Sequence, residues 1–227
     1  CSSFFWHLRH SASCRNSDKV YAMLTNHFWY MPDALSQEEC DYLESKGEQA
    51  FNVHPIDGFH FGEDPSKRSS SISWVHDDLA MNLVDQIGNT ANVDAGWMFH
   101  LIRPEAIQYT LYEKGDEYAW HTDGHQDQYA AKHLVEKSID PMPLNKTTNP
   151  LLAGLVRKVS LTVNLSHPKD YEDGTLELHF HNQTHVFDQC PRGSAIAFPS
   201  FIHHRVAPVT NGIRKTAVMW LNGPPLR

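Results

Sequence analysis

The sequence predicts an α+β fold that is mainly β, a sandwich or jelly roll with N-terminal helices packed on one sheet. Three observations predict it. From Trp97 onward, about eight short segments with strand character alternate with turn residues, as is typical of a sandwich or jelly roll. Before Trp97, two segments carry apolar residues at helical spacing. Helices that precede a run of strands usually pack together on one face of the sheet.

The chain length suits one domain. Residues 1–20 show no clear pattern, and we expect them to form an extension that need not be ordered. The domain is expected over residues 21–227, with its jelly-roll core at about residues 97–225. Its first segment, AMLTNHFWYM after Tyr21, is rich in aromatic residues and predicts a strand.

Two helices are predicted near the start of the domain. Ser36 and Glu39 have the spacing of a capping box, which begins a helix that continues to about Gln49. A loop rich in Gly, Pro and His follows, and a second helix is expected from Asp77 to about Asn89. The residues expected to face the core are Cys40, Tyr42 and Leu43 in the first helix and Leu79, Leu83, Val84 and Ile87 in the second.

Strands are predicted throughout the second half of the chain. The long interruption at residues 124–155 exceeds a hairpin turn, and loops of this length are often lids or binding loops. The predicted strands are 106–112, 117–123, 156–165, 174–180, 184–188, 194–198, 202–206 and 214–221.

Composition limits the classes of function. Hydrophobic residues make up 41% of the 227 residues, as in globular proteins. The net charge of −8 and the pI near 6.0 argue against a general nucleic-acid binder, whose surface would be basic. No apolar run approaches the roughly 18 residues of a membrane-spanning helix and no signal peptide is evident, so we expect a cytoplasmic protein without a membrane partner. The four cysteines lack zinc-binding or redox spacing, and free thiols are expected.

The segment His121-Thr122-Asp123 carries the main chemical signal. Residues two apart on a strand point to the same face, so this imidazole and carboxylate can reach one metal ion. The tripeptide alone is weak evidence, but it ends a stretch in which apolar and polar residues alternate. His204 can add a second imidazole, with its neighbour His203 as the rival. Two histidines and one carboxylate leave three coordination positions open, which is the ligand pattern of non-haem Fe(II) oxygenases.

Arg214, ten residues after His204, supports an oxygenase. Such enzymes need a two-electron donor, and a 2-oxo acid that binds iron through its keto oxygen and C1 carboxylate can supply it. Its far carboxylate then needs a cation, and the arginine guanidinium matches carboxylate geometry. If Lys215 points outward, Arg214 points inward together with Thr216, whose hydroxyl can add a donor. Lys215 is the alternative cation.

Three stretches of the sequence resemble the prolyl 4-hydroxylase-like group of Fe(II)/2-oxoglutarate-dependent dioxygenases, which includes the PKHD-type hydroxylases of bacteria and phages. The stretches are YEKGDEYAWHTD, RKVSLTVNLSHPKDYEDGTLEL and PRGSAIAFPSFIHHRVAPVTNGIRKTAVMWLNGPP. The resemblance covers residues 97–225 well and 21–96 more loosely, and it implies a double-stranded β-helix, the jelly roll of this family. Carried over by position, it implies that His121, Asp123 and His204 bind iron and that Arg214 holds the C5 carboxylate of 2-oxoglutarate.

The resemblance also suggests further pocket residues. Tyr112 matches a tyrosine that contacts 2-oxoglutarate or substrate, with aromatic packing as the alternative role. Asn164 falls where some relatives carry a cosubstrate-contacting side chain, often aromatic, so this chain departs from the pattern there. At Gly174 relatives usually have a Gly-Gly pair, and here Asp173 precedes the glycine. Trp220 is expected in the core or in a pocket wall.

The implied activity is hydroxylation of a C–H bond with Fe(II), 2-oxoglutarate and O2, giving succinate and CO2, with ascorbate as an optional reductant. The carboxylate of Asp123 favours hydroxylation over halogenation, because a halogenase must leave that position to a halide. A prolyl residue in a peptide or protein is the leading substrate, by resemblance alone. The alternatives are a free amino acid or other small molecule, a non-catalytic metal-binding jelly roll, and a zinc hydrolase with the same ligands.

Overall fold

Two helices and three β-sheets make up the described part of the computed structural model, which covers residues 26–53, 56–57, 68–124, 150–152 and 154–225. The predicted extension at residues 1–20 and most of the predicted loop at 124–155 lie outside these residues. The helices are α1 (Gln37–Val53) and α2 (Asp78–Asp94). The strands are β1 (Trp29–Met31), β2 (Ile56–Asp57), β3 (Ser71–Val75), β4 (Arg103–Pro104), β5 (Ile107–Tyr112), β6 (Tyr118–His121), β7 (Val156–Asn164), β8 (Tyr171–Asp173), β9 (Leu176–Phe180), β10 (Gln183–Phe187), β11 (Ala195–Pro199), β12 (His203–Val206), β13 (Val209–Gly212) and β14 (Arg214–Gly223).

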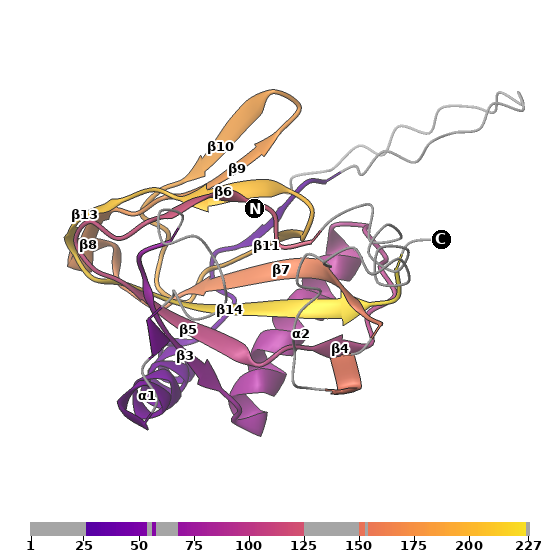
Figure 1. The fold of residues 1–227 in the computed structure, drawn as a ribbon, viewed down its shortest axis with the longest axis horizontal. Coiled ribbons are helices and arrows are strands. Elements are labelled where there is room, and N and C mark those ends of the chain that lie inside the picture. The colour runs from indigo at the N-terminus through magenta and orange to yellow at the C-terminus, as the bar shows by residue number, and fades with distance from the viewer. Residues whose placement is uncertain (1–25, 54–55, 58–67, 125–149, 153, 226–227) are drawn as a thin grey trace, which may run out of the picture.

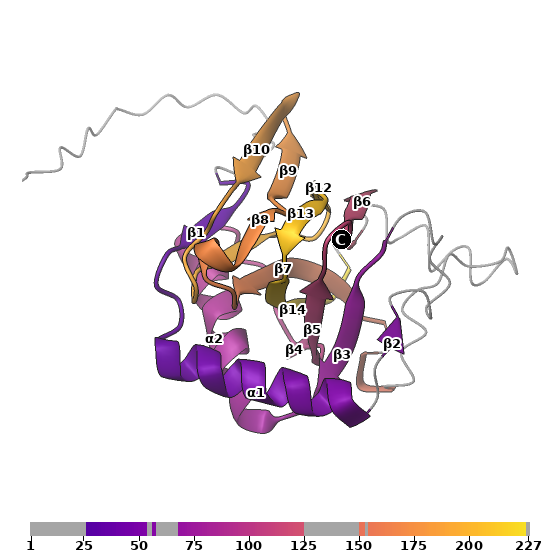
Figure 2. The same ribbon diagram turned by 90° about the vertical axis from the view of Figure 1, so that its left-hand side faces the viewer.

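The large sheet contains eight strands in the order β1-β11-β7-β14-β5-β3-β2, with β4 paired to β14. The small sheet has the order β10-β9-β12-β6, and β8 and β13 form a separate pair. Every paired set of strands is antiparallel (Figure 1). Both helices lie on one side of the large sheet and the small sheet lies on the other (Figure 2). The predicted α+β layout, with helices on one face of a sheet, is therefore confirmed.

The two helices begin where their sequences predict. The backbone N–H of Ser36 donates to Glu39 at 2.8 Å, and the Glu39 N–H donates to the Ser36 hydroxyl at 3.2 Å, which is a complete capping box. Asp77 caps α2 by accepting from the Ala80 N–H at 3.0 Å. Both helices continue about four residues beyond the predicted ends, because packing against the sheet stabilises the added turn.

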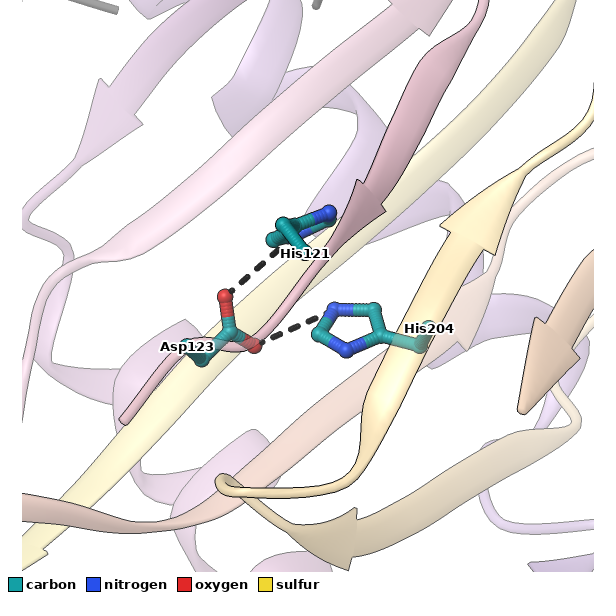
Figure 3. Close-up of side chains that lie close together, drawn as sticks. All are labelled: His121, Asp123 and His204. Carbon is teal, nitrogen blue, oxygen red and sulfur yellow. Dashed lines mark ion pairs between the residues drawn. The ribbon is translucent and has the colours of Figure 1, made fainter. Parts of the chain in front are cut away.

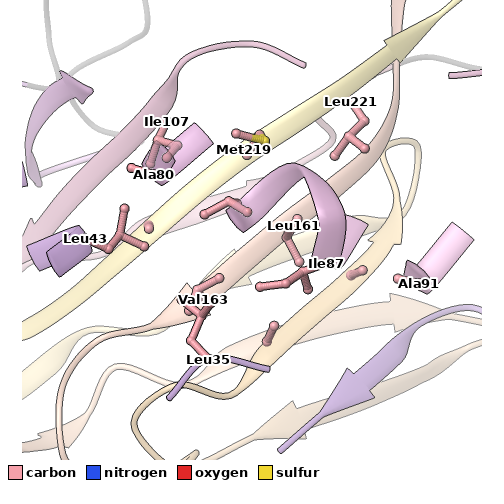
Figure 4. Packing of buried hydrophobic residues seen from close by; sticks show 14 of the residues in the cluster. Leu35, Leu43, Ala80, Ile87, Ala91, Ile107, Leu161, Val163, Met219 and Leu221 are labelled. Carbon is pink, nitrogen blue, oxygen red and sulfur yellow. The ribbon is translucent and has the colours of Figure 1, made fainter. Parts of the chain in front are cut away.

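A hydrophobic core fills the space between the helices and the large sheet (Figure 4). Leu43 of α1 and Val84 of α2 are fully buried there, whereas Leu79, which was expected to face the core, is 55% exposed. Gly47 allows α1 to approach the sheet, because a Cβ at this position would lie 2.3 Å from the ring of Tyr109. A second core between the two larger sheets includes Tyr112 and Leu178. The opening between these sheets is where the candidate site lies.

The eight strands predicted after Trp97 are present, each within about two residues of its expected ends. The strand predicted from the segment AMLTNHFWYM is shorter in the described residues, where β1 covers only Trp29–Met31. No strand was predicted between the two helices, where β2 and β3 lie, and none was predicted at β4, β8 and β13. Strand β3 has the sequence Ser-Ile-Ser-Trp-Val, and its fully buried Ser73 is accommodated by donating a hydrogen bond to the Gly47 carbonyl of α1 at 3.0 Å. No helix in the described ranges is long and apolar enough to span a bilayer.

Candidate metal centre

Two imidazoles and one carboxylate converge between the two larger sheets. His121 ends β6, Asp123 follows two residues later, and His204 in β12 is the cross-strand partner of His121. The Nε2 atom of His121 lies 3.6 Å from Oδ1 of Asp123, and the Nε2 atom of His204 lies 3.4 Å from Oδ2 (Figure 3). The ligand atoms of all three residues lie within 4.8 Å of one another, so one metal ion can contact all three.

Both histidines present an unprotonated nitrogen to this position. The Nδ1 atom of His121 lies 2.8 Å from the Ala119 carbonyl oxygen, and Nδ1 of His204 lies 2.9 Å from the Ile202 carbonyl oxygen. A carbonyl oxygen can only accept, so each Nδ1 carries the proton and donates it. In the neutral ring, Nε2 then carries the lone pair that a metal needs. Metal-binding histidines are commonly oriented by a hydrogen bond of this kind.

The carboxylate of Asp123 is held by two serines. The Ser160 hydroxyl of β7 donates to Oδ2 of Asp123 at 2.6 Å, and the hydroxyl of Ser200 lies 3.0 Å from that of Ser160. The backbone N–H groups of Asp123 and Gly124 both donate to the Ser200 carbonyl oxygen, at 3.0 and 2.8 Å. Asp123 is therefore fixed through both its side chain and its backbone, although it lies just beyond the end of β6.

The site favours the protonation states that a metal requires. Burial alone would raise the pKa of Asp123, but His204 and His121 outweigh it and hold the pKa of this carboxyl well below its ordinary value. Burial lowers the pKa of His204 to about 4, against the opposing effect of Asp123. At neutral pH, Asp123 is therefore ionised and His204 is neutral, and metal binding need not displace a proton from either.

His203, the rival of His204 in the sequence, lies on the opposite face of the small sheet. Neighbouring residues of a strand point to opposite faces, so only one of the two can face Asp123. His203 is exposed and its ring lies 5.1 Å from the ring of Trp120, centroid to centroid, whereas His204 is buried. The structure brings His204 to Asp123.

Arg214 lies beside a small cavity between the sheets. The residue is buried at the start of β14, and no carboxylate in the described part of the chain pairs with it. Its guanidinium carbon lies 5.6 Å from the ring centre of Tyr112, its cross-strand partner. Lys215, the alternative cation, points to the other face and contacts Glu44 and Glu48 of α1. The polar residues that line the cavity with Arg214 are Thr162, Asn164, Tyr171 and Ser194.

A tight turn makes room for the arginine. Asp173 and Gly174 have φ values of +61° and +63°, which Asp tolerates and Gly adopts freely. A Cβ at Gly174 would lie 2.6 Å from Cγ2 of Val209 and 3.2 Å from Cδ of Arg214. The glycine is therefore needed for Arg214 to pack here, whereas the preceding position accepts Asp in place of the usual glycine.

Asn164 and Thr216 were also expected to contact the cosubstrate beside Arg214. The amide nitrogen of Asn164 donates to the carbonyl oxygens of Ser166 and Cys190, at 2.8 and 2.7 Å, and its buried amide oxygen has no partner within the described residues. Asn164 therefore offers the cavity an acceptor, which does not bind a carboxylate directly. Thr216 is buried on β14 but is not among the described residues that line the cavity.

Comparison with known proteins identifies the family. The model of the 2OG-Fe(II) oxygenase superfamily matches residues 107–222, which is about half of the chain and includes His121, Asp123, His204 and Arg214. The chain belongs to the 2OG-Fe(II) oxygenase superfamily. Fe(II), 2-oxoglutarate and O2 are the cofactor and cosubstrates of that superfamily, and a site of two histidines and one carboxylate matches the ligands of non-haem Fe(II).

Individual members of this superfamily are also similar to the chain. A PKHD-type hydroxylase of Picosynechococcus is 41% identical over 75 residues, which cover 33% of this chain and 34% of that protein. A PKHD-type hydroxylase of Alteromonas mediterranea is 30% identical over 146 residues, which cover 63% of this chain and 54% of that protein. The chain thus spans between a third and about half of the length of these curated relatives.

Solved structures in the same superfamily share the fold. A prolyl-4-hydroxylase of Pseudomonas putida has a TM-score of 0.60 at 16% identity, covering 87% of this chain and 92% of that chain. A prolyl hydroxylase of Trichoplax adhaerens, in complex with a peptide fragment of hypoxia inducible factor, has a TM-score of 0.61 at 15% identity. The match covers 87% of this chain and 84% of that chain. These neighbours confirm the predicted jelly-roll fold.

Near the metal centre the structure shows a group of packed residues that the sequence reasoning identified only in part. Trp220 of β14 is the cross-strand partner of Ser160, so its side chain lies next to the serine that holds Asp123. The guanidinium of Arg157 stacks on the Trp220 ring at 3.7 Å and binds Glu105 through two hydrogen bonds of 2.7 Å. The Trp220 indole N–H is buried without a partner in the described part. Only the fold shows this group, because its residues come from three separate strands and segments.

Proposed function

We propose that the protein is an Fe(II)- and 2-oxoglutarate-dependent dioxygenase that hydroxylates a C–H bond of a prolyl residue in a peptide or protein. One observation carries this proposal: a set of two histidines and one carboxylate, of which His204 is buried, lies in the same inter-sheet space as Arg214, a buried cation with no carboxylate partner in the described residues. A metal-binding module without turnover has no need of such a cation.

Each of these side chains has a defined task in the proposal. His121, Asp123 and His204 would hold Fe(II) on one face and leave the remaining coordination positions open. Arg214 would hold the far carboxylate of 2-oxoglutarate, since a guanidinium binds a carboxylate through two parallel hydrogen bonds. Bound Fe(II), 2-oxoglutarate and O2 would supply the oxidising chemistry, with succinate and CO2 as coproducts. The protein's own part is to fix these groups and to exclude water.

The group around Trp220 is consistent with an apolar substrate. The Trp220 ring is apolar and lies beside Ser160, the serine that holds Asp123. The Glu105 carboxylate neutralises Arg157 and keeps its guanidinium flat on the indole ring. A prolyl ring is compact and apolar enough to pack against such a group. The prolyl hydroxylases among the structural neighbours, one of them solved with a peptide, are consistent with this choice.

The test is succinate formation from 2-oxoglutarate with Fe(II) and ascorbate, with and without proline-rich peptides. The proposal predicts that a proline-rich peptide stimulates succinate formation and gains one oxygen atom, detected by mass spectrometry. Arg214→Ala should reduce this activity strongly. Arg205→Ala should not, because Arg205 pairs with Glu177 on the outer face of the small sheet.

The outcomes separate the parts of the proposal. Succinate formation that no proline-rich peptide stimulates would contradict the prolyl substrate and leave the free amino acid or small-molecule alternative. Wild-type protein that binds metal but never forms succinate would contradict the dioxygenase itself and favour the non-catalytic module.

A further inference from the structure

Three histidines gather around Phe180 near the turn of the β9–β10 hairpin, and none of them belongs to the metal centre. His27 lies shortly before β1, His181 begins the turn, and His185 lies in β10. The ring of His27 stacks on the Phe180 ring with the centroids 4.4 Å apart and the planes 5° apart. The ring of His185 also stacks on Phe180, at 4.3 Å and 4°. The hairpin that carries this cluster extends away from the two helices (Figure 2).

Two of these histidines, His27 and His181, are close enough to share one ligand. Their ring centroids lie 4.4 Å apart, with the planes at 72°. In the metal centre, the rings of His121 and His204 lie 4.1 Å apart with the planes at 52°. The two pairs of imidazoles therefore have nearly the same spacing. His185 packs against Phe28 and Phe180, so the second pair supplies two protein ligands where the metal centre supplies three.

The local fold places both rings before any ion binds. His181 and Asn182 have φ values of +50° and +58° and form the two-residue turn between the cross-strand partners Phe180 and Gln183. Positive φ at both central residues is what a type I′ hairpin turn requires, so His181 is held at the end of the hairpin. The stack on Phe180 holds His27. Ligands that are fixed in advance lose little conformational freedom when they bind.

The protonation state of His27 also suits a metal ligand. Burial lowers the pKa of His27, and the neighbouring His181 and His185 lower it further. His27 is therefore neutral at pH 7, and a neutral imidazole has one ring nitrogen with a free lone pair. His181 is exposed, so an ion can reach the pair from solvent and keep water in its other coordination positions.

We propose that His27 and His181 form a second metal site, which binds a divalent ion of the class that prefers imidazole ligands, such as Zn²⁺. Strand β1 lies at one edge of the large sheet, whereas β9 and β10 belong to the small sheet. An ion bound to both histidines would therefore link the two sheets and stabilise the folded chain. The second site does not depend on the proposed dioxygenase function, because it shares no residue with the metal centre.

Equilibrium dialysis with Zn²⁺ at neutral pH tests the second site. His181→Asn removes one imidazole and keeps a residue that tolerates positive φ, so the turn should be preserved. It should bind one Zn²⁺ per chain fewer than the wild type, and His27→Ala should show the same loss. His185→Asn is the matched control from the same cluster and should bind as many Zn²⁺ as the wild type. Mn²⁺ binds imidazole sites most weakly in its series, so its count should be equal in the wild type and in His181→Asn.

Thermal unfolding gives a second readout in variants that lack the metal centre. Zn²⁺ should raise the unfolding midpoint of His204→Ala, because an ion that binds only the folded state stabilises it. The midpoint of His204→Ala/His181→Asn should not rise.

Equal Zn²⁺ counts in the wild type and His181→Asn would overturn the proposal, and so would equal midpoint shifts in the two His204→Ala proteins. A loss of Zn²⁺ in His185→Asn as large as in His181→Asn would also overturn it, because the ion would then not belong to the His27–His181 pair. Loss of Mn²⁺ from His181→Asn would show a general disturbance of the fold and contradict a separate site. None of these results bears on the dioxygenase activity, which succinate formation measures independently.

Discussion

Replacing Ser160 by alanine should weaken metal binding without unfolding the protein. The buried Ser160 hydroxyl donates to Asp123 at 2.6 Å. A hydrogen bond to a charged group contributes about 1.5–3 kcal/mol. The Ser200 hydroxyl lies 3.0 Å from that of Ser160 and can replace part of the lost contact, so the lower end of this range applies. The expected loss is about tenfold in metal affinity, since about 1.4 kcal/mol corresponds to a factor of ten.

Anaerobic calorimetric titration with Mn²⁺ measures this effect. Ser73→Ala is the matched control, because Ser73 is also a buried serine with one hydrogen bond but lies on the helix-facing side of the large sheet, where it donates to the Gly47 carbonyl. The double variant Ser160→Ala/Ser200→Ala should lose about 100-fold, because no hydroxyl then reaches Asp123. If Ser160→Ala and Ser73→Ala bind Mn²⁺ equally well, the serines do not support the metal ligand.

Two further predictions concern stability. Gly47→Ala should lower the free energy of unfolding by about 1–3 kcal/mol, since its Cβ would meet the fixed ring of Tyr109. Gly88→Ala should lower it less, because its Cβ would meet flexible methyl groups of Leu221. Chemical denaturation that ranks the two variants in the opposite order would contradict this reasoning. The Ala80 amide and other contacts lower the pKa of Asp77 to about 2 from 3.8, so its contribution to stability is complete above pH 3.8 and is lost as the pH falls through 2. Asp77→Asn keeps the helix cap and should lose this part of the acid dependence in pH-dependent unfolding, and an unchanged profile would argue against it.

Much of the fold was predictable because short strand-like segments after Trp97 are separated by turn residues and the helices carry regular capping signals. The strand β3 was not, since the burial of Ser73 depends on a carbonyl from a helix over twenty residues earlier in the chain. Leu79 was placed wrongly because helical spacing marks a face but not its limits, and this residue lies at the edge of the buried face. The boundary of the domain at residue 20 and the cytoplasmic location stay predictions.

The sequence predicted those site residues that lie close together in the chain. The spacing of His121 and Asp123 and the position of Arg214 after His204 were visible in the sequence. Ser160 and the Arg157–Glu105 pair were not, because each acts through a partner that only the paired strands bring close. Asn164 was assigned by its position in the family resemblance. It lines the cavity and its amide nitrogen donates to two carbonyl groups, and its role toward the cosubstrate stays a prediction.

The stoichiometry of metal binding in two adjacent histidine variants tests the central claim most directly. His204 faces Asp123, and His203 is exposed on the other side of the same strand. Anaerobic equilibrium dialysis with Fe(II), or with Mn²⁺ in its place, should find one ion per chain in the wild type and in His203→Ala. It should find no tightly bound ion in His204→Ala. Retention of the metal by His204→Ala and its loss from His203→Ala would contradict the proposed metal centre.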